Sequence, residues 1–257
     1  LDGRELLCAK QNRSLNITVL APAGKDTVIP VSCVEAGRWN HASADFSSAP
    51  RAQFSASRAK KAAQVSDSLV SERVARSDQG EVWADIEAKM SRLKSRSATS
   101  AVEKVFEDHE EKLGQYVEHM KCVDGQVGSL FSVKGRLAGM ELFDSAETCH
   151  LLMPKIIRSY ALDAIDPGHR PNNNSGFGSP KEVLELVAGA GYSSHKAVGE
   201  GEDLRFDPTQ GIAGGVLFAR DRIVHLCVFV SEEGQRVGDG NGYRTSASLR
   251  RRFRRTD

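Results

Sequence analysis

The sequence has few cysteines, and they are not spaced as a disulfide framework or a zinc site requires. Its 257 residues include five cysteines, an odd number, spread from Cys8 to Cys227 without a C-x-x-C pair. A disulfide-linked scaffold is therefore not expected, and we predict a reducing, cytoplasmic compartment. Cys149 and His150 are adjacent in sequence and cannot chelate one metal ion together, so no metal site is predicted.

Several other signals are missing. No run approaches the roughly 18 consecutive apolar residues of a membrane helix, and no secretory signal is visible, so no membrane partner is predicted. The patterns G-x-G-x-x-G, G-x-x-x-x-G-K-[ST] and G-x-S-x-G do not occur, which leaves dinucleotide-loop and phosphate-loop binding without support. The sequence begins at Leu1 within the polar turn "LDGREL", and we expect it to be a fragment or a processed chain.

Neither sign of charge dominates the whole chain, but its end is basic. The formal net charge is +1, whereas the stretch from Arg236 to Asp257 contains seven Arg and two Asp. We expect residues 236–257 to form a disordered basic tail. The rest of the chain is mildly acidic, which is not the profile of a dedicated nucleic-acid binder. Nucleic acid is therefore predicted as a partner only through this tail, whose alternative interpretation is a solvated terminal charge run.

Three early segments are rich in Val, Ile, Leu and Thr and predict β-strands. They are "ELLCA", "LNITVL" and "TVIPVSCV", separated by the polar "KQNRS" and by "APAGKD", whose Pro, Gly and Asp favour a turn. We expect residues 1–45 to form neighbouring strands of an antiparallel sheet.

Residues 50–121 have a helical composition, dominated by Ala, Ser, Lys, Arg and Glu. Three helices are predicted there, over about 50–75, 79–95 and 100–121. Asp78 followed by Glu81, and Ser100 followed by Glu103, are typical of helix N-terminal caps. The short polar connection between the second and third helices favours antiparallel packing.

The last part of the chain contains an internal similarity. The segment "GSLFSVKGRLAGMELF" (128–143) aligns without gaps with "GGVLFARDRIVHLCVF" (214–229), at an offset of 86 residues. Each copy is typical of a strand, a tight turn and a second strand, so two β-hairpins are predicted. The similarity is open to two explanations, duplication or chance likeness between hairpins.

Two further helices are predicted between and beside these hairpins. One covers about 145–165, capped by Asp144 and Glu147, with a kink or break expected at Pro154. The other begins at Ser179, with Pro180 at its first position, and ends at Gly189 or Gly191.

Together these patterns predict one α+β domain over residues 1–235. Its core is an antiparallel β structure made from the N-terminal strands and the two C-terminal hairpins. The helical segment 50–121 packs on one side of that core, and residues 125–230 hold the hairpin and helix repeats.

The stretch "TVIPVSCVEAGRWNH" carries the first candidate site. Cys33 and Glu35 are two residues apart, so an extended strand would place them on the same face. A reactive thiolate needs a cationic or basic neighbour, which Arg38 and His41 would supply if the chain turns after Gly37. The structural alternative is that Cys33 packs in the sheet while Glu35 pairs with Arg38.

The polar loop "KQNR" is the second part of the candidate site. Gln11, Asn12 and Arg13 carry amides and a guanidinium, which suit the binding of a nucleotide, a ribose or a phosphate. If this loop folds beside Cys33 and Glu35, the end of the sheet becomes one polar pocket. The alternative is a solvated hairpin loop.

Two more polar residues stand within apolar patterns. Glu141 alternates with Met140 and Leu142, so it is expected to face solvent; the functional alternative is a general base or metal ligand. His109 lies on the apolar face of a predicted helix, where a hydrogen-bonded core histidine is expected rather than a metal ligand.

Several stretches resemble a known family. The segments "LDGRELLCAKQNRSLNITVLAPA", "TVIPVSCVEAGRW", "QGEVW", "GQVGSLFSVKGRLAGMELFD" and "PKIIRSYALDAID" are similar, in order, to the ARG and rhodanese-phosphatase-superfamily-associated protein domain. The similarity runs from Leu1 to about Phe229. It implies further β segments upstream of "LDG". It also implies a context of NAD and ADP-ribose metabolism, known from gene neighbourhood and not from an established activity. Cys8 stands where the family favours a small residue, so this thiol is expected to be incidental.

Two hypotheses about function follow. In the first, the domain binds or processes an ADP-ribose- or NAD-related nucleotide, with Cys33 or Glu35 in the chemistry and Gln11, Asn12, Arg13 and Arg38 as binding groups. In the second, it is a non-catalytic module with a protein partner, bound through an exposed apolar patch such as the surroundings of Trp83. Neither hypothesis identifies a cofactor, a substrate or a reaction.

Overall fold

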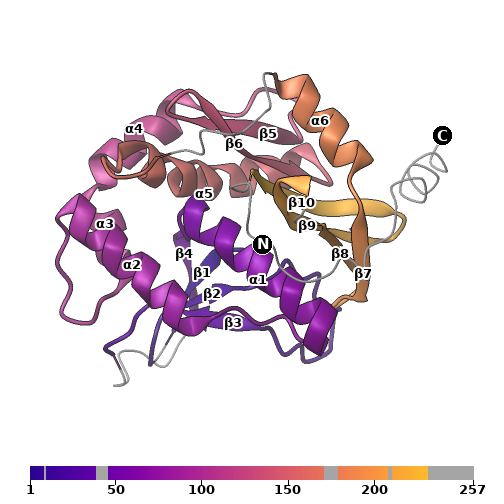
Figure 1. Ribbon diagram of the computed structural model, residues 1–257, viewed down its shortest axis with the longest axis horizontal. Helices are drawn as coiled ribbons and strands as arrows, with labels where there is room; N and C mark the ends of the chain where they lie inside the picture. Colours follow the sequence, from indigo (N-terminus) through magenta and orange to yellow (C-terminus); the bar gives the residue numbers. More distant parts are fainter. Residues whose placement is uncertain (9, 39–45, 171–178, 208–209, 231–257) are drawn as a thin grey trace.

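The computed structural model describes residues 1–8, 10–38, 46–170, 179–207 and 210–230. Trp39, His41 and the basic tail 236–257 lie outside these residues. Across the described ranges the chain forms two antiparallel sheets and six helices, which confirms the predicted α+β fold (Figure 1). Among those helices none combines the length and the apolar character needed to cross a bilayer.

The N-terminal strands form a four-stranded sheet in the order β3-β2-β1-β4. Its strands are short and antiparallel: β1 (Arg4–Leu7), β2 (Arg13–Leu15), β3 (Val31–Cys33) and β4 (Ser47–Ala52). Strands β1 and β3 lie within or next to the predicted segments "ELLCA" and "TVIPVSCV" and end earlier than these apolar runs. Strand β2 shares only Leu15 with the predicted "LNITVL", and its Arg13 and Ser14 were predicted to be part of a loop. The fourth, "SSAPRA", was not predicted, because its composition resembles the helix that follows.

The larger sheet has six strands in the order β5-β6-β10-β9-β8-β7. They are β5 (Gly128–Val133), β6 (Arg136–Phe143), β7 (Tyr192–Lys196), β8 (Glu202–Phe206), β9 (Ile212–Ala219) and β10 (Arg222–Val230). Both predicted hairpins are present, and they join through their second strands, β6 and β10. The hairpin of β7 and β8 was not predicted.

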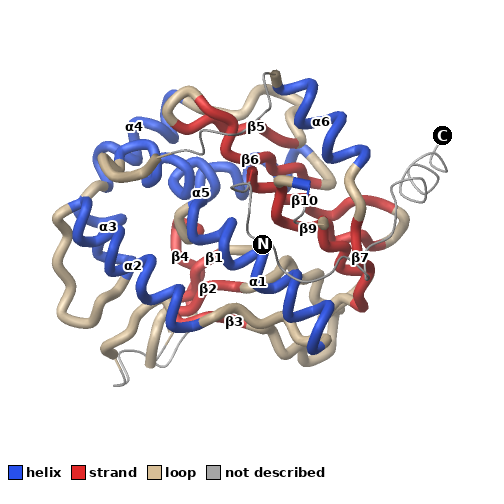
Figure 2. The backbone as a smooth tube through the Cα atoms, viewed as in Figure 1, coloured by secondary structure: helices blue, strands red, loops and turns tan. Residues whose placement is uncertain are grey.

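Six helices surround and separate the sheets: α1 (Ser55–Glu72), α2 (Gln79–Leu93), α3 (Val102–Asp108), α4 (Glu110–His119), α5 (Ala146–Ile165) and α6 (Pro180–Gly189). The predicted helix 100–121 is wrong as a single element, because it divides at His109 into α3 and α4. A kink or a break was predicted at Pro154; there is no break, since α5 continues through it. Figure 2 shows α2 and α3 on the side of the molecule opposite β7.

Helix capping follows the sequence at some ends and departs from it at others. Asp78 accepts a hydrogen bond from the Glu81 amide and begins α2 as predicted. Ser100 does not cap α3, because its backbone is left-handed (φ 49°) and the helix begins after Ala101. The hydroxyl that caps α5 is that of Ser145, one residue after the predicted Asp144.

The two faces of the six-stranded sheet differ in chemistry. One face is apolar and is covered by α6, whose Val183 and Val187 pack against Tyr192, Leu204 and Val228. The other face is turned toward α1, which runs between the two sheets (Figure 1). This second face carries polar residues that are deeply buried.

Candidate functional site

Glu35 is the centre of the cluster that the sequence predicted. It lies just after β3, and its carboxylate accepts three hydrogen bonds: from the Asn12 amide at 3.2 Å, from Arg38 Nε at 2.9 Å and from Thr99 Oγ1 at 2.8 Å. These hydrogen bonds make the buried Glu35 carboxylate the point at which three separate segments of the chain meet.

The loop between β1 and β2 folds onto Glu35. Gln11 Nε2 donates to the Glu35 carbonyl at 3.0 Å, and Arg38 donates to Asn12 Oδ1 at 3.2 Å. Gln11, Asn12 and Glu35 are all buried, whereas 20% of the Arg38 side chain is exposed. The structure thus brings four of the six predicted residues into one hydrogen-bonded group, with Arg38 at its rim.

Cys33 and Arg13 form a neighbouring pair and contact each other. They are opposite residues of β3 and β2, and an Arg13 guanidinium nitrogen contacts Cys33 Sγ. The backbone of Cys33 is held on both sides by the Gln79 amide, at 2.8 Å for each hydrogen bond. Both Cys33 and Arg13 are only partly buried. Cys33 and Glu35 were expected to share one face of an extended strand. Strand β3 ends at Cys33, so Glu35 is not part of it.

A line of charged groups leads from this cluster to an open pocket. Asn12 Nδ2 donates to Glu103 at 3.0 Å, and Glu103 pairs with Arg51 at 3.0 Å. Arg51 also pairs with the fully buried Glu5 at 2.7 Å. Burial raises the pKa of Glu5 although Arg51 opposes the shift. Arg51 lines a pocket of about 360 Å³, which also includes Phe106, Glu107, Glu110 and Arg158.

A second polar cluster lies on the inner face of the six-stranded sheet, and sequence analysis misplaced its central residue. Glu141 was expected to face solvent, but it is fully buried, because α5 packs on β6 and α1 packs on the adjacent β10 and brings Arg58 to the carboxylate. Its Oε1 pairs with Arg58 at 2.8 Å, and its Oε2 accepts from His225 Nε2 at 2.8 Å. The remaining ring nitrogen, His225 Nδ1, lies 2.8 Å from Thr18 Oγ1.

The pKa values of these groups follow from their surroundings. Burial alone would raise the pKa of Glu141, but Arg58 and the hydrogen bond from His225 hold it below its usual value. Burial lowers the pKa of His225 despite the adjacent carboxylate. At neutral pH, Glu141 is therefore ionised and His225 is a neutral imidazole.

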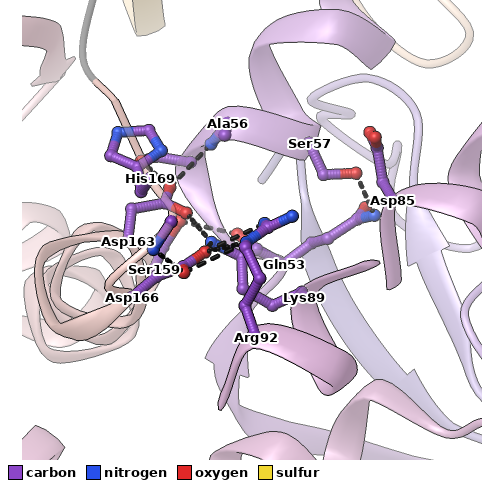
Figure 3. A network of polar contacts seen from close by, with 12 residues as sticks. Gln53, Ala56, Ser57, Asp85, Lys89, Arg92, Ser159, Asp163, Asp166 and His169 are labelled. Carbon is purple, nitrogen blue, oxygen red and sulfur yellow. Dashed lines mark hydrogen bonds and ion pairs between the residues drawn. The ribbon is translucent and has the colours of Figure 1, made fainter. Parts of the chain in front are cut away.

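A third network, shown in Figure 3, connects α2 to the end of α5. Lys89 Nζ contacts Asp163 at 2.5 Å and Asp166 at 2.7 Å, and Arg92 pairs with Asp166 at 2.9 Å. Asp163 also accepts hydrogen bonds from the start of α1, at Ser55. Asp163 and Asp166 each have a cation beside them. We therefore interpret the network as a structural one that holds α1, α2 and α5 together.

The other polar residues singled out from the sequence have simpler positions. His109 is partly buried, with Nε2 at 3.3 Å from the Leu93 carbonyl, as expected for a structural histidine. Cys8 is buried and lies beside the Glu35 cluster, where its carbonyl accepts from Arg38. Within the part of the chain that the structure describes, no three His, Cys, Asp or Glu side chains are grouped closely enough to hold a metal ion.

Comparison with known proteins places the chain in a family. The model of the ARG and Rhodanese-Phosphatase-superfamily-associated Protein domain matches residues 1–229. The chain belongs to this family. The match covers both sheets, all the described helices and all three polar clusters. No curated protein and no solved structure matches the chain. The family name associates the domain with ARG and rhodanese-phosphatase superfamily proteins.

Proposed function

We propose that this domain binds a small molecule of the ADP-ribose or nucleotide type at the Glu35 cluster and the adjoining pocket. The observation that supports the proposal is the meeting of two sequence-distant loops, which leaves the guanidinium groups of Arg13 and Arg38 at the rim of one buried polar centre. Guanidinium groups bind phosphate oxygens in a two-pronged geometry, which suits a diphosphate-containing ligand.

The residues of the cluster have different roles in this proposal. Gln11 and Asn12 hydrogen-bond to Glu35, so they fix the loops and do not face a ligand directly. Glu35 orients Arg38 through the 2.9 Å hydrogen bond. Cys33 is the group best placed for chemistry, because it is partly exposed and touches a guanidinium, the kind of neighbour that a nucleophilic thiol requires.

The pocket beside Arg51 offers room for the rest of such a ligand. Its volume of about 360 Å³ lies within the usual range for small-molecule sites, and it contains the side chains of Arg51 and Arg158. Arg158 is held by a two-pronged pair with Glu110, at 2.5 and 2.7 Å. Glu103 connects this pocket to Asn12, so the pocket and the Glu35 cluster share one set of charged contacts.

Titration calorimetry with ADP-ribose, NAD and AMP tests the proposal. We expect binding to the unaltered chain and at least a tenfold loss of affinity in Arg38→Met and in Arg13→Met. Arg76→Met is the matched control, because this exposed arginine pairs only on the surface with Glu72. The proposal would be rejected if none of the three ligands gave heat of binding or raised the melting temperature. It would also be rejected if Arg76→Met lost as much affinity as the two test variants.

One observation favours the alternative, a non-catalytic module with a protein partner. An apolar groove of about 390 Å³ lies between α4 and α5, lined in part by Val117, Met120, Met153 and Ile157. It is on a different part of the surface from Trp83, which the sequence suggested. On this alternative, Cys33→Ala and Glu35→Gln reduce stability but change no ligand binding, so the same calorimetry separates the two hypotheses.

A further inference from the structure

Thr18, His225 and Glu141 form a continuous hydrogen-bonded relay. The distance from Thr18 Oγ1 to His225 Nδ1 is 2.8 Å, and that from His225 Nε2 to Glu141 Oε2 is also 2.8 Å. Since Glu141 is ionised, His225 Nε2 carries the ring proton and donates a hydrogen bond to the carboxylate. Nδ1 is then an acceptor, and the Thr18 hydroxyl donates to it. This is the order of groups that activates a hydroxyl nucleophile through a neutral imidazole.

The relay ends at a small polar cavity. Thr18 and His225 line a space of about 10 Å³, together with Asp2, Asp203 and Arg205. That volume admits one water molecule. Asp2 is buried, and its Oδ1 has no hydrogen-bond partner among the described residues. The backbone amide of Asp2 donates a hydrogen bond to Thr18 Oγ1 at 3.0 Å. Asp2 therefore contacts the Thr18 hydroxyl and also carries the unpaired carboxylate oxygen.

A cation stands at the same cavity. Arg205 is buried on β8 and is fixed by two contacts with Asp203, at 2.7 and 2.8 Å. Gly215 on the neighbouring strand β9 leaves room for the Arg205 side chain, because a Cβ at position 215 would lie only 3.1 Å from Arg205 Cδ. A fixed guanidinium that lines the same cavity as Thr18 is suited to stabilising an oxyanion in a site from which water is largely excluded.

We propose that Thr18 is the nucleophile of a hydrolytic site for small carboxylic esters, with His225 as general base, Glu141 as the residue that orients it and Arg205 as the oxyanion partner. The cavity has room for one oxygen atom, the carbonyl oxygen of the ester, next to Arg205. Thr18 is only partly buried, so the rest of the ester remains on the solvent side.

The reaction balances without a cofactor. Thr18 Oγ forms a bond to the acyl carbon, and its proton passes to His225 Nδ1. The bond from that carbon to the alcohol oxygen breaks, and the alcohol leaves with the proton from His225. Water then attacks the acyl-threonine ester, again giving a proton to His225. The bond from the acyl carbon to Thr18 Oγ then breaks, the proton on His225 returns to Oγ, and the carboxylic acid is released.

Hydrolysis of p-nitrophenyl acetate by the full chain tests the proposal, with peptide mapping of the acetylated protein. We expect acetyl on Thr18 and a loss of roughly 100-fold in rate in Thr18→Val and His225→Gln. Thr18→Ser, which keeps the hydroxyl, should retain most of the rate even if Thr18→Val folds poorly. Thr27→Val is the matched control, because this threonine lies in a loop and lines neither site.

Cys33→Ala separates this site from the proposed nucleotide site. Acetylation of Thr18 should persist unchanged in that variant, whatever its nucleotide affinity. Two results would overturn the proposal: acetyl found only on cysteine or lysine side chains, or a rate in Thr18→Val equal to that of the unaltered chain.

Discussion

Glu141 and Cys227 lie directly opposite each other on β6 and β10, and they are also equivalent residues of the two hairpins, 86 positions apart in sequence. A pair that is both opposite and equivalent marks a local twofold axis between β6 and β10. The hairpins share further details at the same offset. Each has a register shift next to its turn, which leaves Ala138 unpaired in one and Val224 in the other. The similarity in sequence therefore corresponds to a repeated structure.

The two turns allow a reciprocal test of this equivalence. Lys134 and Gly135 form one turn, and Arg220 and Asp221 form the other, all four with positive φ between 50° and 79°. Glycine tolerates this conformation and aspartate tolerates it less well. We expect Asp221→Gly to raise the free energy of unfolding by about 0.5–1 kcal/mol, and Gly135→Asp to lower it by about as much. Urea denaturation measures both, and changes of the same sign would contradict the equivalence.

The sequence predicted those features that depend on nearby residues. The tight turns, the Asp78 cap and the strand that ends at Cys33 follow from turn chemistry, capping and β propensity. The strand at Arg13 was not predicted, because its polar residues were assigned to a loop. Pairing of β2 with β3 brings the loop at Asn12 beside the chain leaving Cys33, which explains why Asn12 and Glu35 meet.

The inner face of the large sheet could not be predicted in the same way. Alternation along a strand assigns polar residues to solvent, and this rule placed Glu141 outside. The rule fails here because α1, distant in sequence, covers the face and supplies Arg58 to the carboxylate. The strands β7 and β8 escaped prediction for a related reason, since inward-facing Asp203 and Arg205 pair with each other and replace the expected apolar residues.

Removal of Arg58 alone should be strongly destabilising. The side chain is fully buried, and it is the cation paired with Glu141. Arg58→Met leaves that carboxylate without its counter-charge, and we expect a loss of about 3–5 kcal/mol in the free energy of unfolding. The double variant Arg58→Met with Glu141→Met should recover much of the loss. Equal stability of the single and double variants in chemical denaturation would show that the pair is not coupled.

The Lys89 network should give stability that depends on acidic pH. Burial would raise the pKa of Asp166, but hydrogen bonds from Arg92 and Lys89 hold it at about 2, below the usual 3.8. The unfolded chain therefore binds more protons between these values, and the contribution of Asp166 is lost as pH falls from 3.8 toward 2. Lys89→Met should cost about 3–5 kcal/mol at pH 7 and less below pH 4. Lys181→Met, at an exposed site, should cost under about 0.5 kcal/mol.

Lys61 should make the free energy of unfolding rise with pH in the alkaline range. Its ammonium is fully buried and hydrogen-bonded to neutral oxygens of Ser14 and Leu15, and burial lowers its pKa from 10.5 to about 8. Between these values the unfolded chain binds more protons, so the free energy of unfolding gains about 3 kcal/mol from this group as pH rises through the window. Lys61→Met should remove that rise, whereas the exposed neighbour variant Lys60→Met should keep it. Equal free energies of unfolding at pH 8 and pH 10, measured by chemical denaturation of the unaltered chain, would contradict the assignment.

Cys33 should react with alkylating reagents before the core cysteines do. It is partly exposed and touches Arg13, whereas Cys149 is buried and its pKa is raised to about 12 by burial and by Cys122. Iodoacetamide treatment of the folded chain, followed by peptide mapping, should modify Cys33 at least tenfold faster than Cys149. Arg13→Met should slow the modification of Cys33 and leave that of Cys122, also partly exposed, unchanged. Equal slowing at both thiols would point to a general loss of structure, and no slowing at Cys33 would show that Arg13 does not activate it.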